Sequence, residues 1–148
     1  MAPIQDPTGA YVGIWQAKQH AGAGIMAEPG AMCWQELMTP DVGAAGKFYE
    51  ETFGWTADPV DIGGGMMYTV FKSGGTMIGG MMARPADLAN VPPNWMPYFA
   101  VENCDASAAK VGTLGGTVMR PPTDIPNVGR FAVLRDGQGA HFAFLQPK

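Results

Sequence analysis

Hydrophobic and polar positions along the chain follow two rhythms, one of period two and one of period about 3.6, which are typical of strands and helices. β-branched, aromatic or alternating runs predict strands over residues 10–16, 32–38, 56–61, 66–72, 76–82, 95–102, the stretch beginning at 117, 130–136 and 140–147. A first helix is expected over 42–53, after the capping residues Thr39 and Asp41 and before Gly54. A second helix is expected after Asp105, ending at Gly115–Gly116.

Glycine- and proline-rich stretches separate these elements. Residues 17–30 read as a linker, and 84–94 as a proline-containing connection with room for one helical turn. Turns are expected at Gly63–Gly65 and at 73–75, the second closing a hairpin. The loop 121–129 is either a lid over a binding site or a structural connection.

The chain repeats itself in two ways. Asn103–Gly116 aligns with Asp41–Gly54, and the hairpins that follow the two helices also correspond. The order from residue 31 is therefore βαβββ followed by βαβββ, which predicts an α+β protein. In addition, DPTGAYVGIWQ at 6–16 resembles DGQGAHFAFLQ at 136–146, so the N-terminal segment looks like a copy of the last strand.

Composition narrows the class of protein. The 148 residues are 47% hydrophobic and 15% charged, which suits one packed domain. The net charge of -4 and the lack of a Lys/Arg cluster argue against nucleic acid or an anionic membrane as partner. Without an apolar run long enough to span a bilayer or a signal-peptide pattern, we expect a cytoplasmic protein. Cys33 and Cys104 lack a metal-binding spacing and are expected to remain reduced thiols.

The stretch ELMTPDVGAAGKFYEETFGW, the run of three strands after it and the close DGQGAHFAFLQP resemble the vicinal-oxygen-chelate superfamily, the group of glyoxalases, bleomycin-resistance proteins and extradiol dioxygenases. The resemblance implies paired βαβββ modules, at about 31–93 and 94–148, curled into a partly open barrel around a central cup. It also implies a homodimer. Residues 1–30 then resemble the tail of a preceding module and a linker, with the strand over 10–16 completing a sheet within or between chains.

In metal-using members, four strand positions supply His, Gln or Glu ligands. Carried over to this chain, they fall on Trp34, Gly79, Met96 and Ala143, with Gly13 at the equivalent place in the N-terminal strand. None of these side chains binds a hard divalent cation. The expectation is therefore a protein with no metal and no other cofactor.

Strand alternation nominates residues that face the cup. The candidate sets are Trp34, Glu36 and Met38; Met96, Tyr98 and Ala100; Met77, Gly79 and Met81; and His141 with Ala143. From these we expect ligand contacts by Trp34, Glu36, Met77, Met96, Tyr98 and His141. His141 is either a hydrogen-bonded structural side chain or a polar group that binds a ligand or acts as a general base. Glu36 is either solvent-facing or an acid/base partner of His141. His20 lies in the linker and is expected to be solvated.

Two functions are compatible with this set. The first is a metal-free protein that sequesters an aromatic or apolar organic ligand, since the candidate lining is mostly apolar with a few polar groups. The second is a lyase, isomerase or dioxygenase-like enzyme that would use His141, Glu36 or Tyr98 for proton transfer. A third class, a remnant that binds a partner through its N-terminal strand, also stays open.

Overall fold

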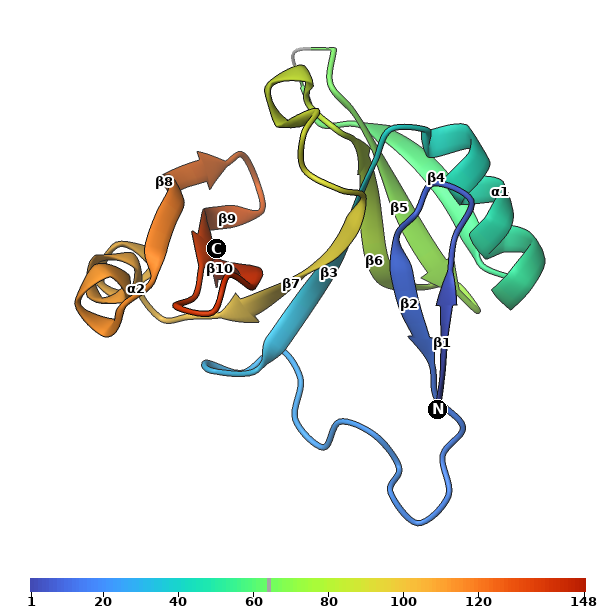
Figure 1. Ribbon diagram of the computed structural model, residues 1–148, viewed down its shortest axis with the longest axis horizontal. Coiled ribbons are helices and arrows are strands. Elements are labelled where there is room, and N and C mark those ends of the chain that lie inside the picture. The colour runs from blue at the N-terminus through green and yellow to red at the C-terminus, as the bar shows by residue number, and fades with distance from the viewer. Residues whose placement is uncertain (64) are drawn as a thin grey trace. The chain divides into compact units, whose positions relative to one another are not determined.

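The computed structural model describes residues 1–63 and 65–148 and divides the chain into two compact units (Figure 1). Unit 1 comprises Met1–Gly22 and Gln35–Trp95, and unit 2 comprises Ala23–Trp34 and Met96–Lys148. Unit 1 thus holds most of the first expected module together with the N-terminal segment, and unit 2 holds the second module together with residues 23–34. The division into modules at about 31–93 and 94–148 stays a prediction.

Unit 1 contains one helix beside a sheet. β3 (Met32–Thr39), which begins in unit 2, is followed by α1 (Val42–Phe53), β4 (Thr56–Asp61), β5 (Met67–Ser73), β6 (Thr76–Ala83) and the short η1 (Ala86–Leu88). The strand order is β4-β5-β6-β3, with β3 parallel to β6 and the other pairs antiparallel. The predicted helix over 42–53 is confirmed, as are the strands around it and the single helical turn in 84–94.

The ends and the buried face of α1 follow from its sequence. The Asp41 side chain accepts a hydrogen bond from the Ala44 N–H at 2.9 Å, and Gly54 ends the helix in the left-handed conformation at φ 68°. Ala45 and Tyr49 point into a core that also contains Leu37, Phe71 and Met81. The helix therefore covers one face of the unit 1 sheet and leaves the opposite face to other side chains.

Unit 2 repeats this plan. β7 (Asn94–Ala100) is followed by α2 (Cys104–Val111), η2 (Gly112–Leu114), β8 (Thr117–Ile125), β9 (Gly129–Arg135) and β10 (His141–Pro147), in the strand order β7-β10-β9-β8. A core under α2 contains Cys104, Ala108, Val111, Ala132 and Leu134.

Asp105 is not the cap of the second helix, as the sequence had suggested. Asn103 caps α2, accepting from the Ala106 N–H at 2.8 Å, while the Asp105 carboxylate pairs with Arg130. The aligned caps are therefore Asp41 and Asn103.

β8 is longer than expected, because it continues through the two prolines to Ile125. Proline is tolerated here because β8 is an edge strand, and its pairing with β9 is irregular between Val118 and Thr123. The segment 121–129 is thus half strand and half turn, which favours a structural connection over a lid.

The N-terminal segment is a hairpin rather than a single strand. β1 (Ala2–Gln5) pairs with β2 (Tyr11–Ile14) in a separate two-stranded sheet, and β1 was not predicted. The predicted likeness to the chain's last hairpin is visible in the loops: Asp6 N–H donates to Ala10 O, as Asp136 N–H does to Ala140 O, both at 2.9 Å. The linker predicted over 17–30, all of whose residues are described, contains no helix or strand.

The fold class is α+β, as predicted. The described residues contain two α-helices and a mixed sheet of eight strands in the order β4-β5-β6-β3-β7-β10-β9-β8. The curling of this sheet into a barrel around a cup stays a prediction. The expected turn at 63–65 lies partly outside the described residues, because residue 64 is not among them. Neither helix in the described part of the chain has the length and apolarity that crossing a membrane requires.

Candidate functional site

The face of the unit 2 sheet opposite α2 carries a cluster of aromatic and apolar side chains, called the aromatic face below. Met96, Tyr98, Phe131 and Ala143 form its buried centre, and Trp34, Cys33, Ile125, Val133 and Leu145 pack against them half-buried. β7 and β10 are parallel neighbours here, with Tyr98 beside Ala143. The cluster therefore has a buried centre surrounded by half-buried, mostly apolar side chains.

The structure brings together three of the ligand-binding residues predicted from sequence. Trp34, Met96 and Tyr98 belong to this one cluster, as strand alternation had indicated. Phe131 was missed, although its place in the strand over 130–136, opposite Leu145 of β10, gives the signal that could have found it.

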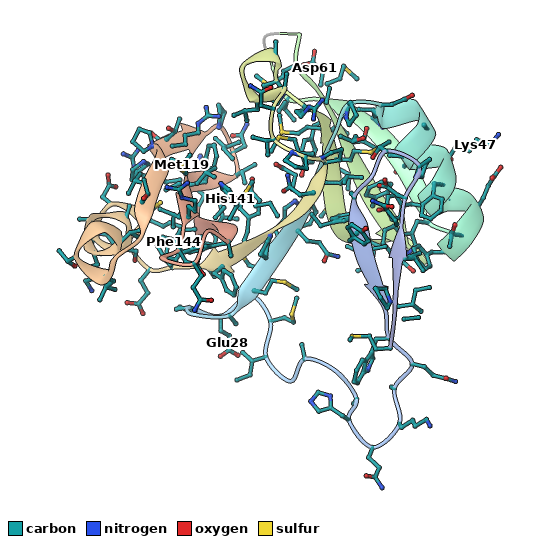
Figure 2. All side chains as sticks on the ribbon, viewed as in Figure 1. Glu28, Lys47, Asp61, Met119, His141 and Phe144 are labelled. Carbon is teal, nitrogen blue, oxygen red and sulfur yellow. The ribbon has the colours of Figure 1, made fainter. Side chains whose placement is uncertain are left out.

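His141 lies at the start of β10, two residues before Ala143, and its side chain is exposed (Figure 2). Its cross-strand neighbour is Arg135. The guanidinium carbon of Arg120 lies 4.9 Å from the centre of the Phe131 ring, a cation–π arrangement. Backbone hydrogen bonds from Ala140 and Gln138 lower the pKa of Asp136, with a smaller contribution from His141. One end of the aromatic face thus carries two arginines and a histidine, with the Asp136 carboxylate nearby.

Glu36 lies in unit 1, on the sheet face opposite α1, and is only 8% exposed. It is therefore buried rather than solvent-facing. Its neighbour on β6 is Gly80, and the Tyr68 phenol lies over that glycine, in the space that a side chain at position 80 would occupy. Tyr68 was not predicted as a site residue, although it is three residues from Phe71 on β5 and therefore faces away from the core under α1. The pairing of Glu36 with His141 stays a prediction, because the two residues belong to different units.

The prediction for the first hairpin is wrong by one residue. Met81 packs beneath α1, Gly79 lies against Gln35 and Trp95, and Met77 is 62% exposed. The residue equivalent to Ala143 is therefore Gly80 and not Gly79.

The physical reason is the hairpin itself. A register shift at Phe71/Lys72 inserts Ile78 between the paired residues Met77 and Gly79. Since side chains alternate with period two, one inserted residue reverses the predicted face.

The residues at the family's metal-ligand positions do not fit a divalent cation. Trp34, Met96 and Ala143 belong to the aromatic face, and Gly80 has no side chain. Among the described residues, no group of three His, Cys, Asp or Glu side chains could hold a metal ion. The donor set available at these positions is aromatic, thioether and methyl, which a hard cation does not select.

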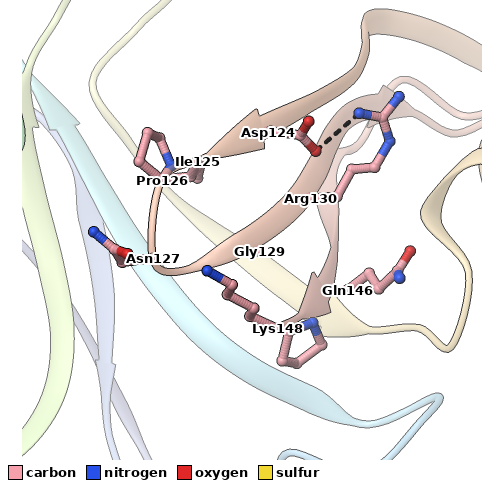
Figure 3. Close-up of a pocket in the computed structure, with 9 residues that line it drawn as sticks. Asp124, Ile125, Pro126, Asn127, Gly129, Arg130, Gln146 and Lys148 are labelled. Atoms are coloured by element: carbon pink, nitrogen blue, oxygen red, sulfur yellow. Dashed lines mark hydrogen bonds and ion pairs between the residues drawn. The ribbon is translucent and has the colours of Figure 1, made fainter.

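Two hollows open elsewhere on unit 2. One, of about 350 Å³, lies at the turn between β8 and β9 and is lined by Asp124, Ile125, Pro126, Asn127, Gly129, Arg130, Gln146, Pro147 and Lys148 (Figure 3). Arg130 is held there by Asp105 and Asp124, and Gln146 accepts from the Cys104 N–H. The other, of about 300 Å³, lies beside α2 over Phe142 and Phe144. Arg130 and Asp124 of the first hollow are already paired with each other, and the second hollow lies on the α2 side of the sheet. The aromatic face, where three of the predicted residues meet, therefore remains the candidate site.

Comparison with known proteins places this geometry in a family. Residues 32–144 match the model of the Glyoxalase/Bleomycin resistance protein/Dioxygenase superfamily. The chain is 48% identical over 147 residues to a Mycobacterium tuberculosis protein named "Putative glyoxylase CFP32", covering 99% of this chain and 56% of that protein. It is 37% identical over 147 residues to the anthracycline biosynthesis protein DnrV of Streptomyces peucetius, covering 99% of this chain and 52% of that protein. The chain thus spans about half the length of these relatives.

Solved structures show the same fold at low sequence identity. A methylmalonyl-CoA epimerase from Streptomyces coelicolor superposes with a TM-score of 0.56 at 18% identity, over 78% of this chain and 96% of that one. The methylmalonyl-CoA epimerase from Mycobacterium tuberculosis also gives 0.56, at 12% identity, over 84% of this chain and 94% of that one. At these identities the likeness concerns the fold alone.

Proposed function

Because the chain belongs to the glyoxalase/bleomycin resistance protein/dioxygenase superfamily, we propose that it binds a flat aromatic or apolar organic molecule on the aromatic face of unit 2, without a divalent metal. The observation that carries this proposal is the cluster of Trp34, Met96, Tyr98 and Phe131. Aromatic and thioether side chains at these places suit stacking and apolar contact, and they replace the hard donors that metal chemistry needs.

The cationic end of the face adds a polar preference. Arg120 lies over Phe131, and Arg135 and His141 are cross-strand neighbours on β9 and β10. These side chains would favour a ligand that carries an acidic or electron-rich oxygen substituent at one edge. The name of the Streptomyces relative points in the same direction, because anthracyclines are flat, oxygen-substituted aromatic compounds.

Fluorescence titration with an anthracycline tests the proposal. Phe131→Leu keeps the apolar volume but removes the ring, so we expect affinity to fall roughly three- to tenfold, as for the loss of one aromatic contact. Phe99→Leu is the matched control, because Phe99 lies on the opposite face of β7, in contact with Phe142. Equal affinities for the wild type and the two variants would reject the aromatic face as the binding site.

An enzyme remains the second candidate, and the buried carboxyl of Glu36 favours it. A lyase, isomerase or dioxygenase-like activity would need a group that moves a proton, and a buried carboxyl can do so. The name of the mycobacterial relative suggests 2-oxoaldehydes as first substrates to try. Turnover that Glu36→Gln abolishes and His141→Ala preserves would favour a Glu36-dependent enzyme, whereas the reverse pattern would favour His141 as the base.

The homodimer and the cytoplasmic location expected from sequence also stay proposals. The aromatic-face hypothesis requires neither, because all residues that carry it belong to unit 2 of one chain.

A further inference from the structure

The hollow of about 300 Å³ beside α2 lies on the side of the unit 2 sheet opposite the aromatic face. Leu114, one of the residues that line it, is 81% exposed, and Phe142 and Phe144 from β10 are only half-buried. α2 contributes Ser107, Lys110 and Val111 to the lining. An accessible hollow lined by two phenylalanines and a leucine is typical of a surface that another group covers.

The equivalent surface of unit 1 is covered by the N-terminal hairpin. With α2 aligned on α1 and β10 on β6, the lining residues Ser107, Val111 and Phe144 correspond to Ala45, Tyr49 and Met81. These three unit 1 residues are at most 1% exposed, and they form one buried cluster with Ala10 from the hairpin loop. The hairpin therefore fills in unit 1 the place that stays open in unit 2.

The chain has a second loop of the same kind, and this one is exposed. Gly9 N–H donates to Asp6 O at 3.1 Å, and Gly139 N–H donates to Asp136 O at 3.2 Å, with φ of 106° and 98° at the two glycines. Ala10 in the first loop is fully buried, whereas residues 136–140 of the second are all exposed. One copy of the loop thus covers a hollow, and the other copy is accessible to a hollow of the same kind.

We propose that the loop 136–140 of one chain docks into the hollow beside α2 of a second copy. Asp136 and Gly137 border the hollow of their own chain. Each chain can therefore both insert its loop and receive the loop of the other, as an interface with two-fold symmetry requires. Ala140 would lie against Phe142 and Phe144 of the second copy, in the way that Ala10 lies in the core of unit 1. This inference gives the expected homodimer a specific interface, and it involves no residue of the aromatic face.

Charge favours a second copy of this chain as the occupant. In unit 1, Asp6 uses Oδ1 to form its turn and accepts from the Tyr49 hydroxyl through Oδ2. Asp136 likewise forms its turn through Oδ1. Val111 in the place of Tyr49 cannot donate a hydrogen bond, but the neighbouring Lys110 is exposed and lines the hollow. The Lys110 ammonium of one copy can therefore donate to Asp136 Oδ2 of the other.

Sedimentation velocity of the whole chain tests the association. We expect a reversible equilibrium between monomer and dimer, which Leu114→Glu and Ala140→Glu should each weaken at least about tenfold, because each places a carboxylate in an apolar contact. Met66→Glu is the matched control, because Met66 is 55% exposed and belongs to unit 1. A monomer at every concentration, or a dimer that neither Leu114→Glu nor Ala140→Glu weakens, would overturn the proposal.

Disulfide trapping then locates the contact. Ser107 corresponds to Ala45, which shares its buried cluster with Ala10. In a Cys33→Ser background, a mixture of Ser107→Cys and Ala140→Cys chains should therefore form a mixed disulfide under mild oxidation several-fold faster than a mixture of Thr56→Cys and Ala140→Cys chains. Thr56 is the control position, because it is exposed on β4 of unit 1. Equal rates for the two mixtures would show that the loop does not enter this hollow and would overturn the proposal.

Discussion

A buried chain of hydrogen bonds ties the N-terminal hairpin to α1. The Trp95 Nε1–H donates to the Tyr49 hydroxyl at 2.8 Å, and that hydroxyl donates to Asp6 Oδ2 at 3.0 Å. Asp6 is 4% exposed, and its other oxygen accepts from the Thr8 side chain and from the backbone N–H groups of residues 8–10. Burial, more than the nearby Asp6 charge, raises the pKa of Tyr49, so the phenol stays protonated and able to donate.

Tyr49→Phe tests this chain at the level of one atom. The variant leaves the Trp95 N–H and one Asp6 oxygen without their shared partner inside the protein, so unfolding by urea should become easier by about 1–3 kcal/mol. Tyr11→Phe is the control, because the Tyr11 side chain is 67% exposed. Equal stability of Tyr49→Phe and Tyr11→Phe would show that this series of hydrogen bonds makes no measurable contribution to stability.

The thiol of Cys33 gives a second prediction at this scale. Desolvation raises the pKa of Cys33 above the ordinary thiol value, and its Sγ lies 3.4 Å from the Tyr98 carbonyl oxygen. Because the thiolate is the reactive form, alkylation of folded protein at pH 8 should be several-fold slower than alkylation of urea-unfolded protein. Cys104, whose thiol pKa is also raised by burial, should behave in the same way, as the Cys33→Ser and Cys104→Ser variants would show separately.

At the scale of elements, the two Asp-x-x-Gly-Ala loops show how one turn works in two environments. In the second loop, Asp136 Oδ1 accepts from the backbone N–H groups of Gln138 and Ala140, and its side chain is exposed. In the first loop, the equivalent Asp6 is buried and also bound by Tyr49. The local sequence therefore specifies the conformation of the turn, whereas the tertiary contact determines how much the turn contributes to the stability of the protein.

Asp6→Ala and Asp136→Ala compare these environments directly. Asp6→Ala should destabilise the protein by about 1–3 kcal/mol, since it leaves the buried N–H of Ala10, two half-buried N–H groups and the Tyr49 hydroxyl without an acceptor. Asp136→Ala should cost clearly less, because water can reach the N–H groups of its loop. A larger loss for Asp136→Ala in urea unfolding would contradict this ranking.

The Asp136 loop also predicts a dependence on pH. Backbone N–H donors lower the pKa of Asp136, so its carboxylate adds stability above the ordinary aspartate pKa, and that contribution disappears as the pH falls through the lowered value. The stability difference between wild type and Asp136→Asn should therefore shrink from pH 7 towards pH 3. Glu28→Gln, at an exposed position, serves as control, and a difference that grows towards acid pH would contradict the assignment.

Local signals fixed most elements correctly. The caps and the glycine stop located α1 to the residue, because those signals act within one helical turn. β8 and β1 were missed in part or entirely. The prolines of β8 are tolerated because β8 lies at the edge of the sheet, and β1 is recognised as a strand by its pairing with β2. Both depend on contacts with residues outside the segment itself, which local sequence signals do not contain.

Strand alternation located the site residues only where the strands are regular. It grouped Trp34, Met96 and Tyr98 in one cluster, as the structure does. It failed at Gly79 and Met81, because the bulge near Ile78 reverses the facing of β6, and so the Tyr68–Gly80 contact stayed hidden. Packing contacts of this kind cannot be read from period-two patterns alone.

At the scale of the whole molecule, the two units share one plan but differ in the chemistry of their equivalent faces. Unit 2 presents aromatic and apolar side chains with a cationic end, and unit 1 presents a buried carboxyl group with a phenol. Neither has hard donors at the positions where metal-using family members place their ligands. The fold is therefore that of the superfamily, and the proposed recognition of an organic ligand rests on these residues rather than on the fold.

The most direct test of this account is a fluorescence titration of an anthracycline into the protein, first in excess EDTA and then with added Mg²⁺, Zn²⁺, Ni²⁺ or Fe²⁺ after removal of the chelator. We predict saturable binding in EDTA, an affinity unchanged within about twofold by any of the metals, and clear weakening in Phe131→Leu. Binding that occurs only after a divalent metal is added, and that Phe131→Leu leaves intact, would contradict a metal-independent aromatic site.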